Sequence, residues 1–360
     1  MKNLIFAGLF FFIFTPFQYA QEQKRSEVIS QQFLGASVQN NNGGEEAMRN
    51  ISVYLPPDYH TSQKKYPTIY FLHGFATDDL EMFQWLGLKK LLDKAIETEQ
   101  IRPVILVVPN SKTKFGGSFY TNSPLIGNWS DYIAKDVVNY VDQNYHTIPN
   151  RDNRGLSGHS MGGNGALKIA MLHPEVFSMV YAMSPAVLDW SNDFTLENPG
   201  FKRLSEYKTE NDVIEGIANS QEKDGFTDFY AAVLASMARA YATNKDITNF
   251  KKISPLYYEN DQPKVNDSIK KIWENNFPLN MIDSHLSALK SLKGIKIDWG
   301  RNEDFPHIPI TALAFSKKLE ENEIVHFSEE YLGDHVNKLD GFDGRIYTDM
   351  LPFFELFLQD

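Results

Sequence analysis

Cysteine is absent from all 360 residues of this chain. Its absence excludes disulfide bonds, thiolate chemistry and a lipid-modified cysteine at a processing site. Basic residues are also scarce, at 35 against 46 acidic ones, which gives a formal charge of −11. Phosphate binding needs clustered lysine and arginine, so this balance argues against nucleic acid and anionic membrane surfaces as partners.

Long hydrophobic runs are missing too, except near the N-terminus. The apolar run Leu4–Phe17 is too short to span a bilayer, and it lies between Lys2 and Ala20. This pattern is typical of a signal peptide, with a retained membrane anchor as the alternative. We therefore expect residues 1–20 to be removed and the mature protein, with a formal charge of −12, to be secreted or periplasmic. No association with a membrane is expected after this removal. The oligomeric state is left open.

The remaining composition, 42% hydrophobic and 22% charged, is typical of a globular protein with a large core. Apolar strand-like runs alternate with helix-like segments, which predicts an α/β fold with a mostly parallel sheet and helices on both faces. We expect one domain over residues 21–360, with a helical insertion at about 187–285 that covers the mouth of the sheet. Strands are predicted at Ile51–Leu55, Tyr66–His73, Val104–Val108, Arg154–Ser157, Met179–Met183, Gly294–Trp299 and Ile324–Tyr331, and helices at Leu86–Glu97, Tyr132–Tyr145, Asn164–Leu172, Asp228–Ala242 and Asp343–Leu358.

A G-x-S-x-G motif at Gly158–Gly162 lies between a predicted strand and a predicted helix. A serine on such a sharp turn adopts strained backbone angles, so the residues two before and two after it must be small. Gly158 and Gly162 meet that demand. The motif predicts that Ser160 is a nucleophile.

A serine hydroxyl is a weak nucleophile and needs a histidine base held by a carboxylate. In this fold class the chain order is serine, acid, histidine, each on a loop after a strand. His335 follows the last predicted strand and is the expected base. Asp304 is the expected acid, and its neighbour Glu303 is the alternative.

Backbone N–H groups must also be aimed at the oxyanion that forms during acyl transfer. The expected donors are those of Met161, directly after the serine, and Phe75, in the turn after the first buried strand. His73 and His159 are expected to support these turns rather than take part in chemistry. Aromatic side chains are candidates for lining the substrate pocket, namely Trp85, Phe119, Tyr120 and Trp129.

These residues resemble the putative-esterase family of α/β-hydrolases, which includes esterase D (S-formylglutathione hydrolases), feruloyl and acetyl-xylan esterases, and mycolyltransferases. The resemblance spans Ile51–Leu358 and implies the α/β-hydrolase fold, with Ser160, Asp304 and His335 as the triad and Phe75 and Met161 as oxyanion donors. Two departures are the enlarged region Val187–His285 and the loop Gly333–His335, where many members have a second glycine before the histidine. The matching segments are Val53–Pro56, Tyr66–Pro67, Leu72–Gly74, Gly117–Tyr120, Gly127–Trp129, Gly158–Gly163, Gly165–Ala166, His173–Pro174, Phe177, Gly300–Phe305 and Gly333–His335.

The function implied is that of a secreted serine carboxylesterase acting on a small-molecule or polysaccharide-linked acyl ester, such as a feruloyl or acetyl ester. No cofactor and no metal are expected. An acyltransferase with a sugar or alcohol acceptor would use the same residues, and a non-catalytic binding protein on a hydrolase scaffold is a third hypothesis. The predicted signal peptide disfavours a glutathione-thioester hydrolase.

Overall fold

The computed structural model describes residues 25–219, 225–244 and 252–358, so the predicted signal peptide lies outside the described residues. Its main sheet has eight strands in the order β1-β2-β4-β3-β7-β8-β11-β12. The pairs β1–β2 and β2–β4 are antiparallel, and every pair from β4 to β12 is parallel. The predicted mostly parallel sheet is confirmed. The strands are β1 (Glu27–Leu34), β2 (Met48–Leu55), β3 (Thr68–Leu72), β4 (Ile105–Pro109), β7 (Arg154–His159), β8 (Met179–Met183), β11 (Gly294–Gly300) and β12 (Phe327–Tyr331), and a small separate hairpin is formed by β5 (Asn122–Ser123) and β6 (Gly127–Asn128).

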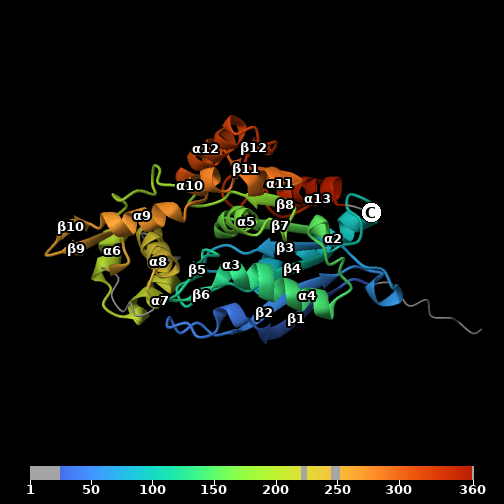
Figure 1. Cartoon of the computed structure of the whole chain (residues 1–360), viewed down its shortest axis with the longest axis horizontal. Coiled ribbons are helices and arrows are strands. Elements are labelled where there is room, and N and C mark those ends of the chain that lie inside the picture. The colour runs from blue at the N-terminus through green and yellow to red at the C-terminus, as the bar shows by residue number, and fades with distance from the viewer. Residues whose placement is uncertain (1–24, 220–224, 245–251, 359–360) are drawn as a thin grey trace, which may run out of the picture.

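Helices cover both faces of this sheet (Figure 1). Successive side chains of a strand point to opposite faces, so each buried strand contributes to two cores. Along β3, Tyr70 and Leu72 enter one hydrophobic core, while Ile69 and Phe71 enter the other. The first core also holds α4 (Val138–Asn144), α5 (Met161–Leu172) and α12 (His307–Glu321), and the second holds α1 (Asp79–Trp85), α2 (Leu88–Glu97) and α13 (Leu351–Phe357). Short α3 (Trp129–Asp131) and the π-helical segment Tyr132–Val137 precede α4, and a second π-helical segment, Ile346–Met350, precedes α13.

Element ends differ from the predictions where local turns intervene. The helix predicted from Leu86 begins at Leu88, after Gly87 in a left-handed conformation with φ of 59°. Helix α1 was not predicted; its N-cap residue Asp78 accepts hydrogen bonds from two N–H groups of the first turn. The range of strand β1 was not predicted either, because half of the residues in this edge strand are polar and they do not alternate with the apolar ones.

The region between β8 and β11 is rich in helices, as predicted. Figure 1 shows most of it gathered beyond one end of the sheet, at the left of the view. Its longest described helix is α8 (Gly225–Ala240), which is buried from Tyr230 to its end. Among the described residues, no helix combines the length and apolar character needed to cross a bilayer. The other elements of this region are α6 (Gly200–Glu206), α7 (Glu210–Asn219), β9 (Leu256–Glu259), β10 (Gln262–Val265), α9 (Asp267–Asn275), α10 (Pro278–Met281) and α11 (Leu286–Ser291).

Candidate active site

Ser160 lies on the sharp turn that joins the end of β7 to the start of α5. Its backbone adopts φ 58° and ψ −118°, a strained conformation for a residue with a side chain. Three hydrogen bonds hold it there: its N–H donates to the carbonyl of Met183, at 3.0 Å, and its carbonyl accepts from Asn164 and Ala186, both at 3.1 Å. The half-buried Ser160 is thus presented as the motif predicts.

The two motif glycines are required by close backbone contacts around this turn. A Cβ atom on Gly162 would lie 2.0 Å from the carbonyl oxygen of Leu72, in β3. A Cβ atom on Gly158 would lie 2.4 Å from the carbonyl oxygen of Gly162. Both distances are far inside van der Waals contact, so only glycine lets β3, β7 and α5 approach in this way.

His335 lies in the loop after β12 and is paired with a buried carboxylate. Its Nδ1 atom lies 2.7 Å from Oε2 of Glu303, whose side chain is fully buried. The other oxygen of Glu303 accepts hydrogen bonds from the Gly300 N–H, at 3.2 Å, and from the Ser184 hydroxyl, at the end of β8. These contacts fix the carboxylate, and among the described residues Nε2 of His335 forms no hydrogen bond.

The prediction of Asp304 as the acid is corrected to Glu303, the alternative considered from the sequence. Asp304 is exposed, and no hydrogen bond or ion pair joins it to His335 in the described structure. The reason is a pair of backbone hydrogen bonds between the loops after β11 and β12, from Arg301 to Tyr331 and from Asn302 to Gly333, each 2.9 Å. These two bonds continue the backbone pairing of β11 with β12 beyond the end of β11. With this pairing, the side chain that faces His335 is that of Glu303.

His159 links the His335 loop to the serine turn. Its Nε2–H donates to the carbonyl of His335, at 2.7 Å, and the two ring centroids are 4.6 Å apart. Burial lowers the pKa of His159 to about 3, so the ring is neutral and serves as a fixed donor. His335 is therefore held beside the residue that directly precedes Ser160, as expected for a supporting role of His159.

The loop after β3 lies next to Ser160 as well. A Cβ atom on Gly74 would be 3.8 Å from the Cβ atom of Ser160, which places the Phe75 turn at the serine. His73 supports this turn, as predicted: its Nδ1–H donates to the Gly74 carbonyl, and its Nε2 accepts from the Ser111 N–H, both at 2.8 Å. Met161 is the first residue of α5, so its N–H has no acceptor within the helix.

A narrow cavity of about 30 Å³ opens at Ser160. Of the four predicted pocket aromatics, Phe119 lines this cavity, whereas Tyr120 and Trp129 are fully buried in the core. Trp85 is 47% exposed on α1, and its ring packs near His159 outside the cavity. The walls are Phe75, Phe119, Met161, Ala186, Val187, Phe229, Tyr230, Val233, Phe305 and His307.

Most of these wall residues were not predicted. Phe229, Tyr230 and Val233 come from α8, and nothing in the apolar sequence of that helix indicates which of its side chains reach the serine. Phe305 connects the cavity to His335, because the two ring centroids are 4.8 Å apart. In the described part of the chain, no group of three or more His, Asp or Glu side chains is arranged to hold a metal ion.

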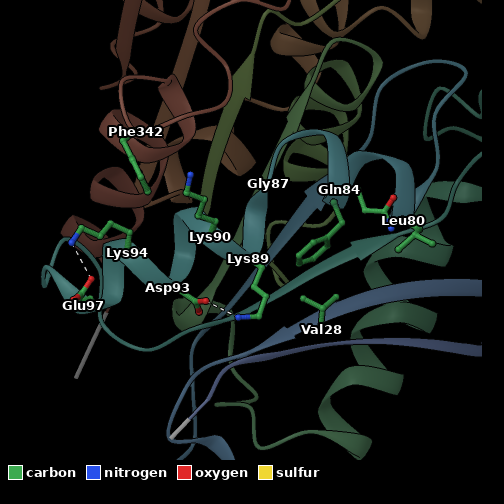
Figure 2. A pocket seen from close by; sticks show the side chains of 11 residues that line it. Val28, Leu80, Gln84, Gly87, Lys89, Lys90, Asp93, Lys94, Glu97 and Phe342 are labelled. Atoms are coloured by element: carbon green, nitrogen blue, oxygen red, sulfur yellow. Dashed lines mark hydrogen bonds and ion pairs between the residues drawn. The ribbon is translucent and has the colours of Figure 1, made fainter. Parts of the chain in front are cut away.

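A larger surface groove of about 830 Å³ runs along α2, but it does not contain Ser160 (Figure 2). Four of its five charged side chains pair with each other, Lys89 with Asp93 at 2.7 Å and Lys94 with Glu97 at 2.9 Å, and the fifth, Lys90, lies over the Phe342 ring. Neither a serine nor a histidine lines it. The smaller cavity, by contrast, contains Ser160.

Solved structures of known esterases share the fold. A ferulic acid esterase matches with a TM-score of 0.62 at 17% identity, covering 93% of this chain and 99% of that one. An S-formylglutathione hydrolase from Staphylococcus aureus matches with a TM-score of 0.54 at 16% identity, covering 93% and 100%. A feruloyl esterase module from Clostridium thermocellum, complexed with sinapinate, matches with a TM-score of 0.53 at 15% identity, covering 94% and 90%. At these identities the likeness shows the fold alone.

Sequence comparison adds the family. Two curated proteins of Mycobacterium tuberculosis, Esterase Rv1288 and Esterase MT1326, are each 35% identical over 127 residues, which is 33% of this chain. The chain matches only 25% of the length of these relatives. The model of the family described as "Putative esterase", by contrast, matches residues 45–344. The chain therefore belongs to this esterase family.

Proposed function

We propose that this protein hydrolyses carboxylic esters through an acyl-enzyme on Ser160, with His335 as the base and Glu303 as the carboxylate that positions it. One observation carries the proposal: a strained serine at the strand-to-helix turn directly follows His159, whose ring is hydrogen-bonded to His335, and His335 is paired with a fully buried carboxylate. A nucleophile, a base and an orienting acid are the three parts that acyl transfer needs.

In this mechanism the Ser160 hydroxyl attacks the ester carbonyl carbon while Nε2 of His335 takes its proton. The carbonyl oxygen becomes an oxyanion, stabilised by the N–H groups of Met161 and Phe75. The C–O bond then breaks, and the imidazolium gives its proton to the departing alcohol. Water attacks the acyl-enzyme by the same route and releases the acid and free Ser160. Glu303 accepts a hydrogen bond from Nδ1–H of His335 throughout and stabilises the imidazolium.

The acyl group enters an aromatic pocket in this proposal. A cavity of about 30 Å³ fits a short acyl group such as acetyl, because ligand pockets for larger molecules have roughly 300–1,000 Å³. A feruloyl group would require side chains such as Phe229 and Phe305 to move aside. The apolar walls and the likeness to structures of feruloyl esterases support acetyl and hydroxycinnamoyl esters, including those attached to polysaccharides, as the substrate class.

The test is a panel of esters offered to the purified protein after removal of residues 1–20. We expect 4-nitrophenyl acetate and methyl ferulate to be hydrolysed and the protein to be labelled by a fluorophosphonate probe. The proposal would be refuted if the protein hydrolysed none of the esters and was not labelled by the probe. If an added alcohol yields more new ester than free acid, the enzyme is a transferase instead.

We further propose that the chain is exported, because Lys2, the apolar run Leu4–Phe17 and Ala20 have the order of a signal peptide. Expression in a bacterial host should place the protein outside the cytoplasm with residues 1–20 missing. Mass spectrometry of the recovered protein checks this. A full-length chain found only in the cytoplasm would contradict the proposal.

A further inference from the structure

A histidine in the wall of the Ser160 cavity has no part in the proposed mechanism. His307 is the first residue of α12, is only 2% exposed, and lines the same cavity as Ser160. The proposed base, His335, lies in the loop after β12, whereas His307 follows β11. Its place in the wall therefore calls for another role.

One side of the His307 ring is fixed by Asp193. The Nδ1 atom of His307 lies 3.1 Å from both carboxylate oxygens, and the His307 backbone N–H donates to Oδ1 at 2.6 Å. The Tyr230 hydroxyl, from α8, also donates to this carboxylate. Burial alone would raise the pKa of Asp193, but the hydrogen bonds from His307 and Tyr230 hold it below its ordinary value. Asp193 is therefore an ionised acceptor, and Nδ1 of His307 carries a proton.

The other side of the ring is left without a partner. In the neutral ring a proton on Nδ1 makes Nε2 an acceptor, and Nε2 is buried with no hydrogen-bond donor among the described residues. Its surroundings are apolar, with the ring centroid of Phe194 at 5.5 Å and that of Phe305 at 6.2 Å. Burying an acceptor unsatisfied is unfavourable, and native structures do so rarely, often at functional positions.

We propose that His307 determines substrate specificity by accepting a hydrogen bond from a hydroxyl group on the acyl part of the ester. The aromatic walls that surround it favour a hydroxyphenyl group, which enters once side chains such as Phe229 and Phe305 move aside, so the preferred acyl group carries its hydroxyl on an aromatic ring. The inference rests on the proposed function, since it concerns an acyl group attached to Ser160. Asp193 is the positioning residue, because it fixes the tautomer that makes Nε2 an acceptor.

The experiment compares two esters of matched shape, methyl 4-hydroxycinnamate and methyl 4-fluorocinnamate, because fluorine is small and has no proton to donate. The wild-type enzyme should favour the hydroxyl ester in kcat/KM by roughly tenfold, as expected for one buried hydrogen bond. His307→Leu should bring this preference to near unity. Any intrinsic difference in reactivity between the two esters is the same in both enzymes, so the change in the ratio isolates the contact.

The matched control is His326→Leu. His326 precedes β12 and is bonded to Ser316 and to the Ile324 carbonyl, away from the cavity. This variant should keep the wild-type ratio. His307→Phe is a second apolar variant, and fluorophosphonate labelling shows whether either variant retains an assembled site. If neither does, the wild-type preference decides after it is divided by the ratio of the two esters' uncatalysed hydrolysis rates at the assay pH, which removes their intrinsic difference in reactivity.

Three results would overturn the inference: no wild-type preference for the hydroxyl ester, an unchanged preference in His307→Leu, or turnover of acetyl esters with none of either cinnamate. In the last case the proposed function still stands. If the wild-type enzyme hydrolyses no ester at all, the proposed function itself is refuted, and this outcome is distinct from the three above.

Discussion

Replacing Ser160 with alanine is expected to lower kcat/KM for 4-nitrophenyl acetate by about 10⁴- to 10⁶-fold. Without the hydroxyl oxygen no acyl-enzyme forms, and His335 has no nucleophile to activate. What remains is the smaller rate acceleration that oxyanion donors and substrate binding supply on their own. Initial rates of 4-nitrophenol release measure the effect, and fluorophosphonate labelling should disappear in the same variant.

Ser157→Ala is the matched control for this change. Ser157 lies three residues earlier on β7, is buried, and donates its hydroxyl hydrogen bond to the Tyr181 carbonyl, so it does not face the cavity. This variant should lose some stability but keep most of its activity. If Ser160→Ala retained activity within tenfold of the wild type while Ser157→Ala behaved alike, nucleophilic catalysis by Ser160 would be refuted.

Ser160 could be predicted from the sequence because its constraint is local. The strained turn, the two glycines and the flanking strand and helix occupy one short segment, and each follows from steric limits within that segment. Predicting His335 as the base required one further premise, namely the chain order of serine, acid and histidine in an α/β-hydrolase. The main sheet was predictable for a similar reason, since the buried parallel strands are nearly continuous apolar runs.

Features that depend on distant contacts could not be predicted in this way. The choice between Glu303 and Asp304 depends on which neighbouring side chain points inward, and that is set by Gly300 and by Ser184, which lies 119 residues away in the sequence. Tyr120 and Trp129 look like pocket aromatics by composition, yet they fill the core. Phe229 and Tyr230 reach the cavity only because α8 packs over the site. The pairing of Asp193 with His307 spans 114 residues and has no local signal.

The corrected acid leads to the second large effect. Glu303→Gln is expected to lower kcat by about 10⁴-fold, as loss of the orienting carboxylate does in other serine hydrolases. Glutamine keeps the shape of the side chain but can donate its amide hydrogen to Nδ1 of His335. The imidazole proton then resides on Nε2, the nitrogen that must accept the proton of Ser160. The fold should be little changed, so the loss should appear in kcat while circular dichroism spectra stay similar.

Asp304→Asn is the control, because it makes the equivalent change at the adjacent position. Asp304 is exposed, and an exposed carboxylate without a partner at the site contributes little to catalysis or stability, so activity should stay within about twofold of the wild type. Measuring kcat for both variants on one ester separates the two assignments directly. A large loss in Asp304→Asn with a small one in Glu303→Gln would reverse them. Equal, small losses would mean that His335 acts without a positioning carboxylate. The expected result is a large loss in Glu303→Gln and a small one in Asp304→Asn. It would show that activity depends on the carboxylate that is fully buried beside His335.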